Sequence, residues 1–262
     1  MAYPVIQSRT NAKIKDGCRL TASAKYRREQ GLFTLEGLRL CADAAQSGCQ
    51  VQTLFLTADA EEKGGERLKI LLKNAQEIYT VTEEVAEKLS DTVSSQGVFA
   101  ILQMLPETAL AIQKGGKYVV LDTVQNPQNL GAIARTAEAF GVNGLIVGGG
   151  CDRYNPKALR ASMGSLLRLP VFETEDLAAT VREIGKTVPT FATVPDCTAE
   201  SICAQDFSGG AAAIIGNEGN GVTDTVKQLC DKSLFIPINS AESLNASVAA
   251  SVIAWELSKS RK

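Results

Sequence analysis

The sequence predicts an α/β protein with a mostly parallel sheet and a second, smaller domain, and three observations lead to that prediction. Six nearly continuous apolar runs lie in the second half of the chain, which is typical of parallel strands covered on both faces. Helical patterns fall between these runs, as in an open α/β sheet. The chain has 262 residues, of which 45% are hydrophobic, which is enough for one large core or two ordinary ones.

Shorter patterns alternate over the first hundred residues. They predict helices and strands in turn: helices over 24–31, 37–48 and 60–75, and strands over 32–36, 51–57 and 96–104. Residues 106–116 then break the pattern with a proline at one end and paired glycines at the other, so we expect a linker there. The predicted domains are therefore residues 1–105 and 117–262.

The second domain alternates strands and helices more regularly. Its predicted strands span 117–124, 143–149, 168–174, 189–194, 210–216 and 232–238. Its predicted helices span 129–140, 156–166, 175–185, 222–231 and 243–258. Ligands of such sheets bind at the carboxyl ends of the strands.

The chain contains no histidine, which excludes His-based triads, His-ligated zinc and imidazole acid–base chemistry. Its seven cysteines form no CxxC pair, so we expect reduced thiols and no metal site. The N-terminal segment lacks an apolar leader, and no run is long enough to span a membrane. We therefore expect a soluble cytoplasmic protein with no membrane partner.

The net charge of −2 hides an uneven distribution. Residues 1–30 carry seven basic side chains against two acidic ones, a local charge of +5: Arg9, Lys13, Lys15, Arg19, Lys25, Arg27 and Arg28 against Asp16 and Glu29. Such a cluster suits a polyanionic partner, and it equally suits a solvated helix face.

Polar residues and glycines gather in three segments of the second domain. In the first, residues 126–141, Asn129 is the predicted N-cap of a helix, Gly131 permits close backbone approach, and Arg135 follows further along the helix. Arg135 is either a solvated charge or a functional group, and the neighbouring Asn side chains and Gly131 favour function.

The second segment, residues 214–222, is an apolar strand followed by three glycines around Glu218. It matches neither GxGxxG nor a P-loop, and it suits either a tight turn or a backbone site for a planar ligand. The third segment, residues 236–256, leads into an Ala-rich helix with Ser243 as the predicted N-cap. Small residues on this helix favour a tight helix–helix contact.

Together the three segments resemble motifs 1, 2 and 3 of the SpoU (TrmH) family of S-adenosylmethionine-dependent RNA ribose methyltransferases. The matching residues are Asn129, Gly131, Arg135, Thr136, Phe140 and Gly141, then Gly216, Glu218, Gly219 and Gly221, then Ile236, Pro237, Ser243, Leu244, Asn245, Ser247 and Ala249. Residues 155–165 are similar to a family segment between motifs 1 and 2. SRTNAKIK and FTLEGLRL are similar to the family's L30e-like substrate-binding domain. Asn126, Ile238 and Ala246 depart from the family pattern at positions without a chemical role.

The resemblance implies a C-terminal trefoil-knotted methyltransferase domain, an exception to the rule of unknotted chains, and a smaller N-terminal L30e-like α/β domain. The implied methyl donor is S-adenosylmethionine, without a metal. The implied cofactor-binding residues are Thr193, Gly216, Asn217, Ile236, Leu244 and Asn245. A homodimer with the active site at its interface is also implied, with Arg135 directed toward the partner's cofactor.

The implied catalytic residues are Arg135, Asn129, Glu218, Ser243 and Asn245. A ribose 2′-hydroxyl attacks the methyl carbon, and in one account Arg135 is the general base. Because a guanidinium stays protonated, we favour Arg135 as a bidentate clamp on the target phosphate, with phosphate or solvent taking the proton. Asn129, Ser243 and Asn245 would bind ribose, phosphate or loop, and Glu218 would orient Arg135 or a loop.

Structured RNA of the 23S ribosomal type is the favoured substrate, with transfer RNA as the alternative. The predicted RNA-binding residues are Arg9, Lys13, Lys15, Arg27, Arg28 and Arg39; such phosphate contacts are salt-sensitive, whereas RNA shape and unpaired bases give specificity. Two other functions stay open. One is non-catalytic RNA binding, and the other is a nucleotide-dependent oxidoreductase, which the missing GxGxxG disfavours.

Overall fold

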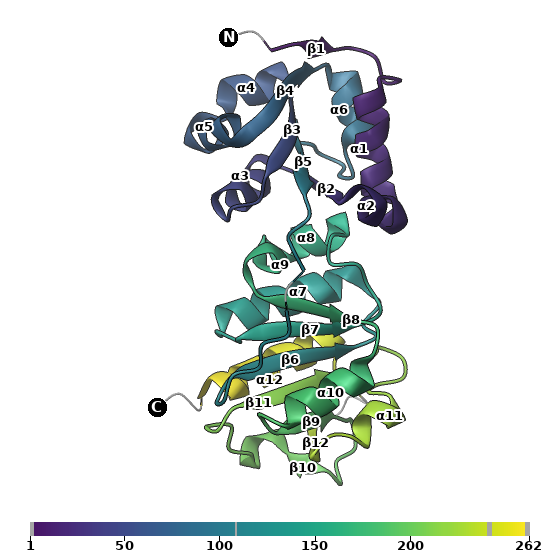
Figure 1. Cartoon of the computed structure of the whole chain (residues 1–262), viewed down its shortest axis with the longest axis vertical. Helices are drawn as coiled ribbons and strands as arrows, with labels where there is room; N and C mark the ends of the chain where they lie inside the picture. The colour runs from purple at the N-terminus through teal and green to yellow at the C-terminus, as the bar shows by residue number, and fades with distance from the viewer. Residues whose placement is uncertain (1–2, 108, 240–242, 260–262) are drawn as a thin grey trace. The chain divides into compact units, whose positions relative to one another are not determined.

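The structure is a computed structural model that describes residues 3–107, 109–239 and 243–259 (Figure 1). The chain divides into two compact units, residues 1–106 with 154–167 and residues 107–153 with 168–262. The first boundary lies at the start of the predicted linker 106–116, in which residue 108 is outside the described residues.

We predicted one boundary between the two domains, at residues 106–116, and the structure corrects this in one respect. Residues 154–167, which we assigned to the second domain, belong to the first unit. Tyr154 packs on Phe33 with a ring-centroid distance of 4.8 Å, and Ala158 and Leu159 are fully buried. Apolar contact with the first unit therefore decides where this segment lies.

The first unit contains a five-stranded sheet of order β1-β4-β3-β5-β2. Its strands are β1 (Val5–Ile6), β2 (Leu32–Glu36), β3 (Val51–Leu56), β4 (Ala75–Val81) and β5 (Val98–Gln103). β5 runs antiparallel to both of its neighbours, and the other pairs are parallel. The helices are α1 (Ala12–Ala22), α2 (Ala24–Gln30), α3 (Leu38–Gln46), α4 (Ala58–Lys63), α5 (Gly65–Asn74), α6 (Glu83–Leu89) and α8 (Pro156–Ser162).

Local sequence explains most of these elements. Gly31 ends α2 in the left-handed conformation at φ 65°, as a C-terminal glycine does. The predicted helix over 60–75 is two helices, because the chain turns at Gly65 with φ 58°. β1, β4, α1 and α6 were not predicted; α1 buries Ile14 and Leu20, which join α6 and the sheet in one apolar cluster.

The second unit contains a seven-stranded sheet of order β10-β12-β9-β11-β6-β7-β8, and its described strand pairs are all parallel. Its strands are β6 (Lys117–Asp122), β7 (Gly144–Gly148), β8 (Val171–Thr174), β9 (Thr190–Thr193), β10 (Glu200–Ser201), β11 (Ala211–Ile215) and β12 (Lys232–Phe235). Its helices are α7 (Pro127–Ala139), α10 (Leu177–Gly185), α11 (Asp224–Lys227) and α12 (Ala246–Lys259), with a 3-10 turn at Ile202–Ala204. α9 (Ser165–Arg168) ends at the return to this unit.

The six strands predicted for this half all form, and the sheet is parallel as expected. α10 and α11 contribute to the apolar core on one face, whereas α12 packs against β6, β11 and α7 (Figure 1). The predicted helix over 222–231 shortens to α11, and the one over 156–166 breaks at Met163, where φ is 49°.

All seven cysteines are free thiols. Among the described residues, no helix combines the length and apolar character that crossing a membrane requires.

Candidate functional site

The carboxyl ends of β6, β9, β11 and β12 share one edge of the parallel sheet, and the loops that follow them form the candidate site. A cavity of about 310 Å³ lies between three of these loops. Seven predicted site residues line it: Thr193, Gly216, Asn217, Glu218, Ile236, Ser243 and Leu244. Val194, Pro195, Asn220, Ile238, Ala246 and Ala249 complete much of the lining and were not predicted as site residues.

The loop after β11 folds back on itself. Asn217 and Gly221 exchange two backbone hydrogen bonds of 3.0 and 2.9 Å. A Cβ atom on Gly216 would lie 1.9 Å from the carbonyl carbon of Gly221, so no other residue fits there without moving the loop. Residues 216–221 of this closely folded loop line the cavity, as expected of a site for a planar, polar-edged ligand.

A second loop is held against the first by the Asn217 side chain. Its amide nitrogen donates to the carbonyl of Thr123 at 2.9 Å, and its oxygen accepts from the N–H of Gly219 at 2.8 Å. Thr123 has φ 55°, a conformation that a β-branched residue rarely adopts. Backbone strain of this kind gathers at functional sites.

Three predicted catalytic side chains form one hydrogen-bonded chain. Asn129 donates its amide N–H to Glu218 at 2.7 Å, and Asn245 donates to the side-chain oxygen of Asn129 at 3.2 Å. Each residue comes from a different sequence segment. The structure thus brings together all three motif segments at one edge of the cavity.

Two predicted helix caps are wrong. The observed helix starts explain why Asn129 and Asn245 are available for the hydrogen bonds just described. Asn126, not Asn129, caps α7, accepting from the N–H of Gln128 at 2.9 Å. Asn129 therefore lies inside the first turn, 6% exposed, and its amide is free to bind Glu218. α12 begins at Ala246 rather than at Ser243, and Asn245 accepts from the N–H and hydroxyl of Ser247 at 2.9 and 2.7 Å.

Glu218 is ionised at neutral pH. Partial burial raises the pKa of its carboxyl, but hydrogen bonds from Asn129 and from the backbone N–H groups of Gln125 and Asn126 outweigh burial and hold that pKa below its usual value. A carboxylate with a lowered pKa is a weak base, so its role is to fix the loop after β6. The structure does not bring it to Arg135.

Arg135 stands apart from this chain on α7. Its side chain is exposed and forms no hydrogen bond or ion pair within the described part of the chain. The next residue, Thr136, pairs with Ser251 of α12 at 3.1 Å, and α7 and α12 pack against each other. Arg135 thus lies exposed on the helix that packs against α12.

Comparison with known proteins now adds to this geometry. Residues 116–255 match the SpoU rRNA Methylase family. The chain belongs to that family. The prediction of a SpoU-type RNA methyltransferase is confirmed, and it decides against the oxidoreductase alternative. Residues 11–100 match the MRM3-like substrate binding domain.

Individual SpoU relatives cover nearly the whole chain. It is 31% identical to the 23S rRNA (guanosine(2553)-2'-O)-methyltransferase RlmP of Bacillus subtilis over 96% of this chain and 98% of that protein. An rRNA methyltransferase from Sinorhizobium meliloti superposes with a TM-score of 0.87 at 26% identity, covering all of both chains. The SpoU methyltransferase AviRb from Streptomyces viridochromogenes, solved in complex with AdoMet, superposes with a TM-score of 0.82 at 28% identity over 96% of this chain and 98% of that one.

The basic residues predicted to bind RNA differ in availability. Arg9, Lys15, Arg28 and Arg39 are exposed, Arg39 lying 3.8 Å from Asp43. Lys13 is half-buried and pairs with Glu77 at 2.6 Å, and that hydrogen bond raises the pKa of Lys13. Arg27 is a correction: it is 2% exposed and donates to the carbonyls of Leu20 and Thr21 at 2.5 and 3.0 Å. Its charge satisfies the end of α1 and is withdrawn from the surface.

Proposed function

We propose that this SpoU-family chain transfers a methyl group from S-adenosylmethionine to a ribose 2′-hydroxyl of structured RNA, with 23S-type ribosomal RNA as its substrate. The observation that carries the proposal is the Glu218–Asn129–Asn245 chain of hydrogen bonds at the edge of a Gly-lined cavity. The relatives' names support the substrate, since RlmP and the Sinorhizobium protein are named as rRNA enzymes. We place the activity in the cytoplasm, where ribosomal RNA is assembled.

The residues around the cavity fit the methyl donor. Gly216 lets the loop after β11 close on itself beside the cavity, Ile236 and Leu244 offer apolar cover, and Thr193 and Asn217 offer polar groups nearby. AviRb, whose fold this chain shares, was solved with AdoMet. When bound, this donor supplies a methyl group on a cationic sulfonium, so that the protein need only align the reactants and manage one proton.

We propose that Arg135 aligns the RNA. A guanidinium remains charged at neutral pH and clamps a phosphate through two parallel hydrogen bonds, which would place the neighbouring 2′-hydroxyl for attack. The hydroxyl proton then passes late in the reaction to phosphate or solvent. Asn129 and Asn245 keep the loops after β6 and β12 in register, and Ser243, which lines the cavity, would bind ribose or phosphate.

A trefoil knot and a homodimer complete the proposal. The chain after β12 borders the cavity together with the loop after β11, then packs as α12 against β6, β11 and α7, and we propose that it threads a trefoil knot on the way. On α12, Val248 and Trp255 are 48% and 49% exposed, and Trp255 contacts Phe140 of α7 with ring centroids 5.4 Å apart. A second copy covering this apolar face would bring Arg135 toward the partner's cavity.

The proposal is tested by incubating the full chain with deproteinised 23S ribosomal RNA and methyl-labelled S-adenosylmethionine. The expected result is label at one nucleotide, where the ribose resists alkaline cleavage. Transfer RNA in a parallel reaction tests the alternative substrate. Cofactor binding without transfer to either RNA, free or assembled in ribosomal subunits, would overturn the proposed function. Light scattering should give twice the chain mass, and a single chain mass would overturn the dimer.

A further inference from the structure

The chain passes between its two units three times, and the proposed function makes no use of the segment between the last two passages. Residues 154–167 leave the second unit after β7 and return to it at Arg168. β7 and β8 are parallel, so their connection needs a crossover of about a dozen residues or more. This crossover places its helix, α8, within the first unit.

Tyr154 fixes the entry of this segment. Its side chain is 5% exposed, and its hydroxyl accepts the backbone N–H of Leu105 at 2.9 Å. Leu105 directly precedes Pro106, the residue at the first passage between units. One hydrogen bond within the first unit therefore joins two residues that lie at or next to different passages.

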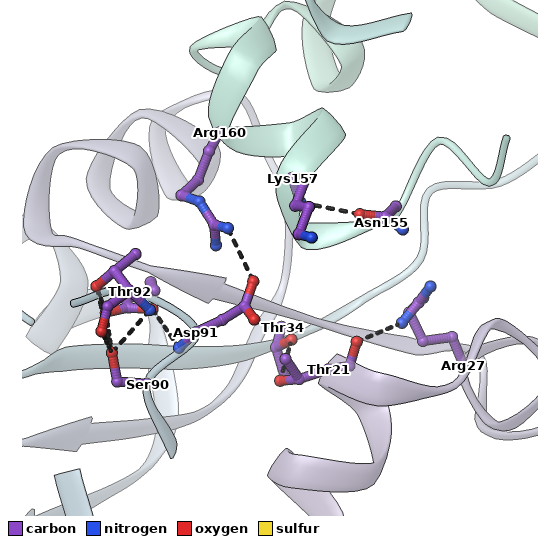
Figure 2. A network of polar contacts seen from close by, with 10 residues as sticks. Thr21, Arg27, Thr34, Ser90, Asp91, Thr92, Asn155, Lys157 and Arg160 are labelled. Carbon is purple, nitrogen blue, oxygen red and sulfur yellow. Dashed lines mark hydrogen bonds and ion pairs between the residues drawn. The ribbon is translucent and has the colours of Figure 1, made fainter. Parts of the chain in front are cut away.

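Arg160 fixes the middle of the segment. Figure 2 shows it reaching from α8 to Asp91, and the guanidinium nitrogen lies 2.8 Å from the carboxylate. The loop that carries Asp91 is itself anchored, because Glu36 accepts from the hydroxyls of Ser90 and Thr92 at 2.8 and 2.6 Å and from the N–H of Asp91 at 3.0 Å. α8 is thus fastened to a rigid part of the first unit.

The other end of the connection reaches the catalytic loop. The N–H of Cys151 donates to the carbonyl of Val124 at 3.0 Å. A Cβ atom on Gly150 would lie 2.3 Å from that same carbonyl oxygen, so the two loops touch. Val124 directly precedes the two backbone N–H groups that hold Glu218.

We propose that residues 149–160 couple the substrate-binding unit to the catalytic loop, with Arg160 and Tyr154 as positioning residues. The inference rests on the proposed function. RNA held by the first unit would favour one position of α8. Through the contact of Cys151 with Val124, that position would in turn stabilise the loop that orders Glu218 and Asn129. Because such coupling is reciprocal, RNA must tighten cofactor binding by the same factor as cofactor tightens RNA binding.

The test is calorimetric titration of the full chain with S-adenosylhomocysteine, which cannot react, in the absence and presence of deproteinised 23S ribosomal RNA. The quantity compared is the ratio of the affinity for S-adenosylhomocysteine with RNA to the affinity without RNA. In the unaltered chain this ratio should be at least about five. In Arg160→Ala it should fall to within about twofold of one, while the affinity without RNA stays unchanged. Tyr154→Phe, which removes only the hydroxyl, should lower the ratio in the same direction.

Two further variants separate coupling from loss of an ion pair in general. The exchange Asp91→Arg with Arg160→Asp should restore the ratio. Lys69→Ala removes another ion pair of the first unit, with Glu66, and should leave the ratio unchanged. An unaltered ratio in Arg160→Ala, or a ratio of one in an unaltered chain that methylates RNA, would overturn the coupling. Failure of the unaltered chain to methylate any RNA would overturn the proposed function instead.

Discussion

Polar groups are organised in opposite ways in the candidate cavity beside the loop after β11 and in the basic helices α1 and α2. Around the cavity, carboxamides, a carboxylate and backbone N–H groups fix one another at 2.7–3.4 Å, and a glycine sits where a Cβ atom cannot. On α1 and α2, Lys15, Lys25 and Arg28 extend into solvent. We therefore expect binding in the cavity to depend on the exact positions of its groups, and binding to α1 and α2 to depend on the number of their exposed charges.

That difference sets how each region should respond to substitution. A cavity built from interlocked loops loses its geometry when one contact is lost, since the neighbouring groups depend on it. Exposed charges act on a polyanion almost independently, so that each contributes a small and salt-dependent share. We therefore expect large effects of single changes in the cavity and small, additive ones on the helices.

Gly216→Ala should have the largest effect on cofactor binding, because the new methyl group would occupy the position of the Gly221 backbone. We expect S-adenosylmethionine affinity to fall by more than about 100-fold, measured by calorimetry on protein whose circular dichroism is unchanged. Gly209→Ala is the matched control, since a Cβ there meets nothing within 4 Å. Normal cofactor binding by Gly216→Ala would show that the loop is pliable rather than fixed by its shape.

Arg135→Ala should abolish methyl transfer, by about 1,000-fold or more, while changing cofactor affinity less than about twofold. Within the described chain Arg135 forms no hydrogen bond or ion pair and does not line the cavity, so its loss should spare the cavity. Arg135→Lys keeps the charge but not the two parallel hydrogen bonds, and should recover only part of the rate. Arg182→Ala, another exposed helical arginine, is the control. Collapse of cofactor binding in Arg135→Ala would contradict the role of a phosphate clamp.

The two regions differ in what the sequence could predict. The residues alone left both a tight turn and a ligand site open around Gly216 and Glu218, and the resemblance to the SpoU motifs grouped Glu218 with Asn245, which the structure joins through Asn129. Arg27 and Arg28 are neighbours of the same type, and only the packing of α2 decides which one is buried. Thr123, with its positive φ, and residues 154–167, which join the first unit, depend on tertiary contacts that local sequence does not specify.

Asn129→Asp tests the contact between Asn129 and Glu218. It would replace a 2.7 Å hydrogen bond to Glu218 with two facing carboxylates, which must share a proton and whose joint pKa is therefore raised. In the unaltered chain the Glu218 pKa is lowered, so that this carboxylate stays ionised and contributes its contacts at every pH above its ordinary range, losing them only in acid.

The variant should accordingly lose about 100-fold in transfer rate at pH 8 and regain part of it at pH 6, where one carboxyl is protonated. The measurement is the initial rate at both pH values, divided by that of the unaltered chain. Asn143→Asp, whose oxygen accepts from the N–H of Lys117 at 2.8 Å, should show no such recovery. An equal deficit at both pH values would mean that Glu218 and Asn129 do not act as a pair.

The smallest effects should come from the adjacent arginines of α2, which test the second region directly. Arg28→Ala removes one exposed charge, so that RNA affinity should fall a few-fold, the slope of log affinity against log salt should decrease by about 0.7–0.9, and the melting temperature should not change. Arg27→Ala leaves two α1 carbonyls without their donor, and should lower the free energy of unfolding by about 1–3 kcal/mol without altering that slope. Filter binding across a salt series and thermal denaturation measure both quantities on the same two proteins. A decrease of the salt slope in Arg27→Ala would mean that Arg27 contacts RNA. That result would contradict the structural role that its burial and its bonds to α1 assign to it.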